Sequence, residues 1–407
     1  MRFPSIIAST AVLITSSRHS VAFAPRLARF RSFASTTSTS SASPTAVVLS
    51  SSSSSSSTAA PAAAAESGTA VDYGGIPHVA VIVESAADAL KYYTQVLGMD
   101  CDEAAAASLD VPGACVRVGE QTIHLLELPN PDPKDVDPTY SMSAPPKGYV
   151  AEGRPVHAGR DRHVAITLHD LSPLRESLEA NGVNYTMSYS GRQALFCRDD
   201  YGNGWEFGPP LTYEKATRLF PPYLAPEFPA DGAKKAADAP VINWGGIPHV
   251  GILVSDTPRA EAFYCGVLGM VDENDLRPVK LPFPGLFLRC GEQQVHVLEL
   301  PNPDPDTVEA RPGPGRDRRT GFSVKSLAPV EAALEAAGVP FTRGEVGAAG
   351  ALSKQQAEAE EETKKAKCVY CYDPDANELV FVEDAGIQVI KEDMINNAPM
   401  VPWTRLW

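Results

Sequence analysis

The feature that most constrains this chain is an internal repeat of whole motifs. The hexapeptide Gly-Gly-Ile-Pro-His-Val occurs at 74–79 and again at 245–250. A period this long far exceeds the roughly 20–50 residues of solenoid repeats, so we predict a duplicated domain. Three further motifs recur in the same order: Val-Leu-Gly-Met at 96–99 and 267–270, Leu-Glu-Leu-Pro-Asn-Pro-Asp-Pro at 126–133 and 298–305, and Gly-Arg-Asp-Arg at 159–162 and 315–318.

Each half of the first copy is expected to contain a strand, a helix and then about three strands. Residues 78–83 are β-rich and follow Gly-Gly-Ile-Pro, which predicts a strand. Residues 86–97 have a helical rhythm that ends at Gly98. We therefore expect an α+β fold. The remaining predicted elements are strands at 114–118, 122–128, 163–168, 185–189, 194–198 and 205–208, and a helix at 173–180.

The two copies differ in their connections. The first copy has a longer connection over about 140–157, and the second, which repeats the pattern over 247–382, has an Ala/Glu/Lys-rich insertion at about 344–367. We predict that this insertion is an exposed loop or a short helix. The expected domains are a first domain at 73–212, a linker at 213–243, a second domain at 244–385 and a tail at 386–407.

Residues 1–72 differ in composition from the rest of the chain. They contain five Arg and no Lys, an early apolar stretch and a serine run over 50–57. An apolar stretch followed by Arg- and Ser-rich, acid-poor sequence is typical of targeting segments, and the tandem resembles the bipartite presequence of algae with complex plastids. We expect a signal peptide at 1–24, a transit peptide or Ser/Ala-rich linker at 25–72, and a plastid location. Secretion with a flexible linker is the alternative.

Charge and hydropathy exclude two classes of binding partner for this chain, nucleic acids and membranes. The formal net charge is −15, so a nucleic-acid partner is not expected. The chain has no apolar run of about 18 residues or more, so no membrane partner is expected for the mature protein. The duplication predicts a pseudo-dimer of two domains, which could also form a homodimer, with a small molecule as substrate.

Several motifs resemble those of the vicinal oxygen chelate superfamily, which includes glyoxalase I, methylmalonyl-CoA epimerase, extradiol dioxygenases and bleomycin-resistance proteins. The resemblance covers about 73–210 and 244–384, and it implies tandem βαβββ modules that curl into cups around a metal. It does not specify one reaction, because this fold serves many. The motifs are Ile-Pro-His-Val-Ala-Val at 76–81, Tyr-Tyr-Thr-Gln-Val-Leu-Gly-Met at 92–99, Ile-His-Leu-Leu at 123–126, Arg-His-Val-Ala-Ile at 162–166 and Asp-Tyr-Gly-Asn-Gly-Trp-Glu-Phe at 200–207.

The resemblance implies a ligand set of four residues in the first copy: His78, His124, His163 and Glu206. Three imidazoles and one carboxylate suit Zn, Ni, Co, Mn or Fe(II) better than Ca. Such an ion acts as a Lewis acid on adjacent substrate oxygens and stabilises an enediolate. Glu206 is also the candidate catalytic base.

The second copy retains half of this set. His249 and His296 match the first two ligands, but Arg319 and Val380 stand at the positions of the last two. A guanidinium is always cationic and a valine has no donor atom, so the second copy cannot build a four-ligand site by itself.

Two arrangements of the site are therefore open. In the first, the four residues of the first copy bind the metal. In the second, His249 and His296 join His163 and Glu206 across the two copies. Both arrangements give one complete site per chain and both need His163 and Glu206.

Other polar residues are weaker candidates. Arg160 and Arg162 precede a predicted strand and could clamp a substrate carboxylate or phosphate, although a solvated turn fits equally. His157 and His169 match no ligand position and are expected at the surface.

The leading hypothesis is a metal-dependent lyase or isomerase resembling glyoxalase I, the lactoylglutathione lyase type. Its substrate would be a small α-oxo or hydroxy compound, such as a thiol adduct of a 2-oxoaldehyde. Two alternatives are a metal-free small-molecule-binding protein of the same fold and an Fe(II) extradiol-type dioxygenase, which needs only two His and one carboxylate.

Overall fold

The computed structural model describes residues 70–138, 140, 149–168, 170–188, 194–209, 242–277, 281, 283–347, 365–386 and 388. The expected targeting segments, apart from residues 70–72, most of the linker and nearly all of the tail lie outside these ranges. None of the described helices is both long and apolar enough to span a membrane.

The first copy contains the predicted strands and helices. Its helix at 86–97 is present in two parts: α1 is capped by the Ser85 hydroxyl, which accepts from the Asp88 backbone N–H at 3.2 Å, and the second part is π-helical. The elements are β1 (Tyr73–Gly75), β2 (His78–Val83), α1 (Ala86–Lys91), η1 (Tyr92–Val96), β3 (Asp100–Cys101), α2 (Glu103–Ala107), β4 (Gly113–Val118), β5 (Gln121–Glu127), β6 (Val136–Asp137), β7 (Arg154–Pro155), η2 (Ala158–Arg160), β8 (His163–Thr167), α3 (Ser172–Ala180), β9 (Tyr185–Met187), β10 (Leu195–Arg198) and β11 (Gly204–Gly208).

The second copy repeats the main strands and helices in this order, with η4 in place of α2 and without counterparts of β1, β6 and β7 among its described residues. Asp256 caps α4 as Ser85 caps α1, and a π-helical segment again follows. The predicted insertion at 344–367 is partly wrong, because strands extend into it from both ends, while 348–364 lies outside the described residues. The elements are β12 (His249–Val254), α4 (Thr257–Glu261), η3 (Ala262–Val267), β13 (Val271–Asp272), η4 (Asn274–Leu276), β14 (Gly285–Cys290), β15 (Gln293–Glu299), η5 (Val308–Ala310), β16 (Arg319–Val324), α5 (Ala328–Ala337), β17 (Phe341–Gly347), β18 (Lys365–Tyr372) and β19 (Glu378–Glu383).

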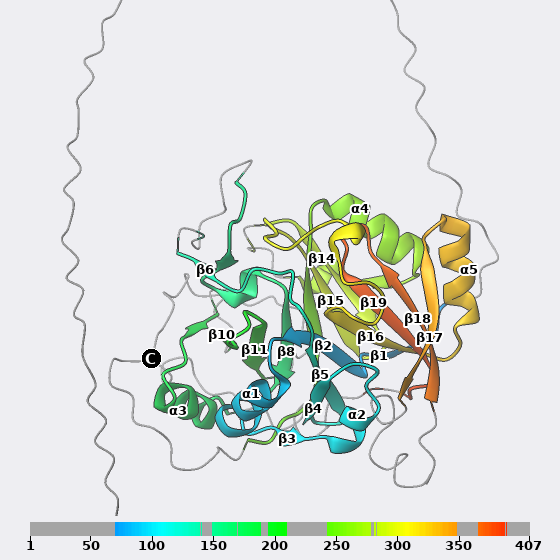
Figure 1. Cartoon of the computed structure of the whole chain (residues 1–407). Helices are drawn as coiled ribbons and strands as arrows, with labels where there is room; N and C mark the ends of the chain where they lie inside the picture. Colours follow the sequence, from blue (N-terminus) through cyan, green and yellow to red (C-terminus); the bar gives the residue numbers. More distant parts are fainter. Residues whose placement is uncertain are drawn as a thin grey trace, which may run out of the picture. The chain divides into compact units, whose positions relative to one another are not determined.

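The two large sheets each combine strands from both copies (Figure 1). One has the order β17-β18-β19-β16-β2-β5-β4-β3, and the other has the order β13-β14-β15-β12-β8-β11-β10-β9. The joints are antiparallel pairs, β2 with β16 and β8 with β12. Each sheet therefore combines the N-terminal half of one copy with the C-terminal half of the other copy.

The helices and the core connect the halves of each copy. The Tyr93 hydroxyl donates to Asp199 at 2.7 Å, and the equivalent Tyr264 hydroxyl donates to Asp373 at 2.8 Å. All four side chains are buried, so each bond satisfies groups that would be costly to leave unpaired. A single hydrophobic cluster contains residues from both copies.

A buried network of arginines and aspartates also joins the copies. Asp304, from the second Pro-Asn-Pro-Asp-Pro turn, accepts from Arg162 Nε at 2.9 Å and pairs with Arg154. Asp132, from the first such turn, accepts from Arg318 at 2.6 Å and from Arg162 at 3.0 Å. Because these turns lie far apart in sequence, the network fixes one copy against the other.

The charges in this network are mutually compensated. Burial alone would raise the pKa of Asp304, but Arg162, Arg318 and Arg154 outweigh it and hold that pKa well below its usual range. The pKa of Asp132 is lowered in the same way. These carboxylates are therefore ionised at neutral pH, as a buried ion pair requires.

Candidate metal site

Three adjacent strands position the candidate metal ligands. His163 begins β8, Glu206 lies in β11, and His249 begins β12. β11 runs parallel to β8 with Glu206 opposite Ala165, and β12 runs antiparallel to β8 with Gly251 opposite His163. This register brings side chains from both copies to one point.

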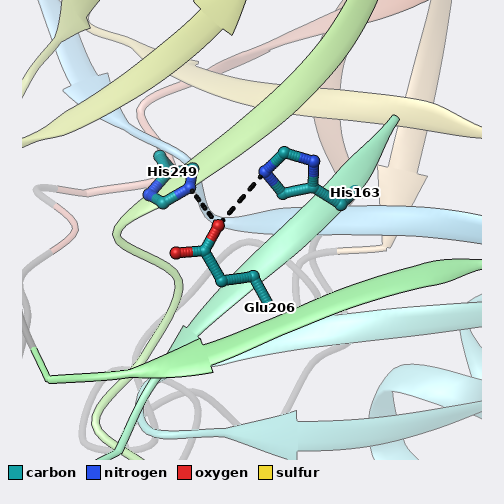
Figure 2. A group of neighbouring side chains, drawn as sticks. All are labelled: His163, Glu206 and His249. Atoms are coloured by element: carbon teal, nitrogen blue, oxygen red, sulfur yellow. Dashed lines mark hydrogen bonds and ion pairs between the residues drawn. The ribbon is translucent and has the colours of Figure 1, made fainter. Parts of the chain in front are cut away.

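The three ligand atoms converge, as Figure 2 shows. Glu206 Oε2 lies 3.3 Å from His249 Nε2 and 3.4 Å from His163 Nε2. All the ligand atoms lie within 4.8 Å of one another, and all three side chains are buried. Among the described residues, this is the group of His, Cys, Asp and Glu whose geometry could hold a metal ion.

A backbone contact sets the tautomer of His163. Its Nδ1 lies 2.8 Å from the Asp161 carbonyl oxygen, which can only accept, so Nδ1 carries the proton. In the neutral ring Nε2 then presents a lone pair to the site; this atom is buried, makes no hydrogen bond and lies 3.4 Å from Glu206 Oε2. The Asp161 carboxylate pairs with Arg154 at 3.1 Å and Arg198 at 2.8 Å, so the buried network orients this ligand.

Gly251 makes room for the His163 ring. A Cβ at this position would come within 2.4 Å of His163 Cε1, closer than real side chains approach. On the other sheet a different glycine of the second copy makes a similar close approach, because a Cβ on Gly321 would lie 2.6 Å from His78 Cε1. Small residues beneath the imidazoles are therefore a structural requirement in both sheets.

His296 lies beside the three ligands but outside their group. Its ring stacks between Phe287, at 3.6 Å, and His249, at 3.8 Å. Its Nε2 lies 3.1 Å from Gln294 Oε1, whose amide nitrogen donates to Glu273 at 2.6 Å. In this conformation His296 supports the His249 ring, and three residues rather than four converge.

The arrangement within the first copy is not the one the structure adopts. His78 and His124 lie on the β2/β16 sheet, stacked on each other at 4.5 Å, while His163 and Glu206 lie on the β8/β12 sheet. The physical reason is the exchange of halves, which pairs β8 with β12. The structure instead brings together His163, Glu206 and His249 of the cross-copy arrangement.

His157 was predicted at the surface, and that prediction is wrong. The side chain is buried, its Nδ1 lies 2.6 Å from the Thr186 hydroxyl, and its ring contacts Phe196 at 4.5 Å. Burial lowers its pKa well below the usual value, Arg160 adds to this, and Glu206 opposes it. His169 lies outside the described residues.

The two arginines considered as a substrate clamp differ in their surroundings. Arg162 is held between Asp132 and Asp304, so its guanidinium is already engaged in the buried network. Arg160 is buried near the ring of Phe283, 5.6 Å from its centroid. A direct substrate contact by Arg160 stays a prediction.

The donor set fits a divalent transition metal. Two imidazoles and one carboxylate match Zn, Ni, Co, Mn or Fe(II), whereas Ca binds mainly through oxygens. The buried Nε2 of His163, which makes no hydrogen bond, would donate its lone pair to such an ion. The remaining coordination positions would stay open to water or substrate, as in catalytic rather than structural sites.

The chain belongs to the Glyoxalase/Bleomycin resistance protein/Dioxygenase superfamily, whose sequence model matches residues 75–207 and 246–381. The predicted α+β fold of tandem glyoxalase-like modules is thereby confirmed. Members of this superfamily generally use a divalent metal. No curated protein sequence matches the chain at a significant level.

Solved structures of the same superfamily resemble the chain. Glyoxalase I from Zea mays is 15% identical and aligns over 76% of this chain and 92% of its own, with a TM-score of 0.42. Lactoylglutathione lyase from Agrobacterium tumefaciens is 20% identical over 34% of this chain and 94% of its own, with a TM-score of 0.22. A glyoxalase/bleomycin resistance protein/dioxygenase from Alicyclobacillus acidocaldarius is 17% identical over 36% and 93%, with a TM-score of 0.24.

Proposed function

We propose that this protein is a metal-dependent lyase or isomerase resembling glyoxalase I, acting on a small α-oxo or hydroxy compound. The observation that carries the proposal is the convergence of His163, Glu206 and His249. When bound there, a divalent ion would supply Lewis-acid polarisation of adjacent substrate oxygens.

The protein's own groups would hold and move the proton. Glu206 is the carboxylate at the centre of the site and is the general base for a proton next to a carbonyl. His163 is fixed in one tautomer by Asp161, so its ring does not need to reorient during turnover. The buried ring of Phe196 lies against His163, and that of Phe287 stacks on His296 beside the site, so both limit the access of water.

The finer assignment is a thiol adduct of a 2-oxoaldehyde as substrate. Its α-hydroxy or α-oxo oxygens are the adjacent pair that such a site recognises, and proton transfer by Glu206 between the two carbons would interconvert hydroxy-carbonyl forms. Turnover of a glutathione–methylglyoxal adduct, followed by its ultraviolet absorbance, tests this assignment. Turnover that persists in Glu206→Gln would contradict the role of this carboxylate.

The first prediction concerns metal content and uses the full chain. Wild-type protein is expected to hold about one transition-metal ion per chain, and His163→Ala with Glu206→Ala is expected to lose it. His249→Ala should weaken binding by tenfold or more, because it removes one of three converging ligands. Elemental analysis after dialysis measures these outcomes.

The β2/β16 sheet, which does not contain the candidate metal site, offers the matched control. His78→Ala with His124→Ala removes two equally buried imidazoles but should leave the metal content unchanged. Loss of metal in this variant with retention in His249→Ala would show that the site is built within the first copy. Absence of metal in wild type after reconstitution would overturn the proposal and favour a metal-free binding protein.

A second candidate function follows from the position of His296. With this imidazole outside the group, the converging set is two histidines and one carboxylate, which is also the ligand set of Fe(II) oxygenases. Catechol-dependent oxygen uptake by the Fe(II)-loaded protein tests this candidate. Oxygen uptake without adduct turnover would replace the lyase proposal with the dioxygenase.

A further inference from the structure

On the β2/β16 sheet, Arg319 and Val380 stand at the positions that His163 and Glu206 occupy on the other sheet. A cavity of about 260 Å³ lies over this sheet, and its walls include His78, His124, Arg319 and Tyr370. Val380 stands opposite Gly321 as Glu206 stands opposite Ala165 in the other sheet. The cavity therefore corresponds by symmetry to the candidate metal site.

Arg319 is a buried cation that forms no ion pair among the described residues. Its side chain is only 8% exposed, yet its Nε has no hydrogen-bond partner, and its Nη1 donates to the Gly315 carbonyl oxygen at 2.9 Å. Among the described residues, no carboxylate oxygen lies within 4.0 Å of its guanidinium. The neighbouring Arg318 is also buried, but it forms an ion pair with Asp132. The two adjacent arginines therefore differ in that, among the described residues, only Arg318 has a carboxylate partner.

The acidic residue opposite Arg319 on the paired strand forms no ion pair with it. Glu378 is opposite Arg319 in the β16–β19 register, but one of its oxygens accepts from the Gly315 backbone N–H at 2.5 Å. Burial raises the pKa of Glu378 to about 8, against the opposing effect of Arg319.

The two imidazoles add directional polar groups to the same wall. Neither ring nitrogen of His78 has a hydrogen-bond partner, and Nδ1 of His124 also has none, although all three atoms are buried. A neutral imidazole offers one donor and one acceptor, which suits a hydroxyl or carbonyl oxygen. The guanidinium carbon of Arg319 lies over the Tyr370 ring, 6.0 Å from the ring centroid.

From this arrangement we infer that the β2/β16 cavity binds a small 2-hydroxy or 2-oxo monocarboxylate without any metal. The Arg319 guanidinium receives the carboxylate, and the imidazoles of His78 and His124 contact the oxygen on the adjacent carbon. A guanidinium presents parallel N–H donors that match the two oxygens of a carboxylate. The volume limits the ligand to a compact one, since drug-sized ligands need about 300–1,000 Å³.

The cavity supplies the positive charge that the metal would supply in the other sheet. In the β8/β12 sheet, Glu206 and two imidazoles leave that charge to an added ion, whereas here Val380 removes the carboxylate and Arg319 provides a fixed cation. The site therefore recognises an anion directly and has no group at the position of Glu206 to move a proton. It binds without turning over its ligand.

The test is binding of glycolate to the full chain, measured by saturation-transfer NMR or calorimetry at millimolar ligand. Glycolamide serves as the uncharged probe of nearly the same shape, and it should bind at least tenfold more weakly. Arg319→Met should weaken glycolate binding at least tenfold. His163→Ala with Glu206→Ala, which disrupts the other site, should leave it unchanged.

A second variant guards against misfolding of Arg319→Met. Thr342 is exposed at the edge of the cavity and lies in register with Tyr370, so Thr342→Trp should fill the opening without disturbing the core. It should also weaken glycolate binding at least tenfold, with unchanged thermal unfolding. Equal binding of glycolate and glycolamide, no binding to wild type, or loss of binding in the His163→Ala and Glu206→Ala variant would each overturn the inference.

Discussion

At the scale of single residues, one hydrogen atom decides whether the candidate metal site can form. Gly251 lies so close to the ring of His163 that a methyl group at this position would overlap the ring. We predict that Gly251→Ala displaces this imidazole, costs about 1–3 kcal/mol of stability and lowers metal affinity about 10–100-fold. Calorimetric titration with Zn²⁺ and thermal unfolding measure the two effects.

Gly321→Ala is the matched control for that prediction. It imposes the same kind of clash on His78 in the other sheet, so it should cost similar stability but leave metal affinity unchanged. At Gly266 no atom lies within 4 Å of the added carbon, so Gly266→Ala should leave metal affinity unchanged. Its effect on stability should be limited to a small gain from helix propensity. If Gly251→Ala bound metal like wild type, the position of His163 would be unimportant for the site.

At the scale of elements, β7 contributes through one side chain. Arg154 is fully buried and pairs with Asp161 and Asp304, so its removal leaves both carboxylates short of a partner. We predict that Arg154→Met lowers the free energy of unfolding by about 3–5 kcal/mol, as for other broken buried ion pairs. Urea denaturation of the full chain measures this loss.

An exposed ion pair supplies the comparison. Arg343 pairs with Glu331 at 2.7 Å, but its side chain is mostly exposed, so Arg343→Met should cost less than about 1 kcal/mol. Similar losses for the two substitutions would mean that the buried network does not hold the copies together.

The elements themselves could be predicted from the sequence, but their partners could not. The strand at 78–83 and the helices beginning near 86 and 173 follow from local periodicity and turn residues, and the structure contains them. Pairing of β8 with β12 rather than β2 is a choice between near-identical strands, and local patterns carry no information on it. For the same reason, His163 and Glu206 were common to both arrangements, while the choice between His78 and His249 stayed open.

Residues that act through long-range contacts were also beyond local analysis. The Pro-Asn-Pro-Asp-Pro turns were recognised as repeats, but the approach of Asp132 and Asp304 to arginines of both copies depends on the completed fold. His157 was missed because it has no counterpart in the second copy. Its burial follows from the path of the connection that carries it.

At the scale of the whole molecule, the network makes stability depend on pH. The folded-state pKa values of Asp132 and Asp304 are depressed, whereas an unfolded Asp titrates near about 3.9. Their contribution is therefore fully present above about pH 5 and is lost as the pH falls below about 4, because the unfolded state then binds more protons.

We predict that the urea midpoint of wild type falls steeply between about pH 5 and pH 3, and that Asp304→Asn has a lower midpoint with a weaker dependence over this range. Parallel curves for the two proteins would assign the acid sensitivity to other carboxylates. The measurement needs only tryptophan fluorescence, since Trp205 and Trp244 are buried.

Covalent fusion of the two copies gives this chain a freedom that a homodimer lacks. In a homodimer one gene specifies both symmetric cups, so a substitution such as valine for the central glutamate would erase the two sites together. Here Val380 and Arg319 lie in the β2/β16 sheet, while Glu206 and His163 occupy the equivalent positions of the β8/β12 sheet. The copies follow one another along the chain, but each large sheet combines halves of both. Replacing the second copy by the first would therefore give two sheets with the same residues at the four candidate ligand positions, and the difference between the sheets would disappear.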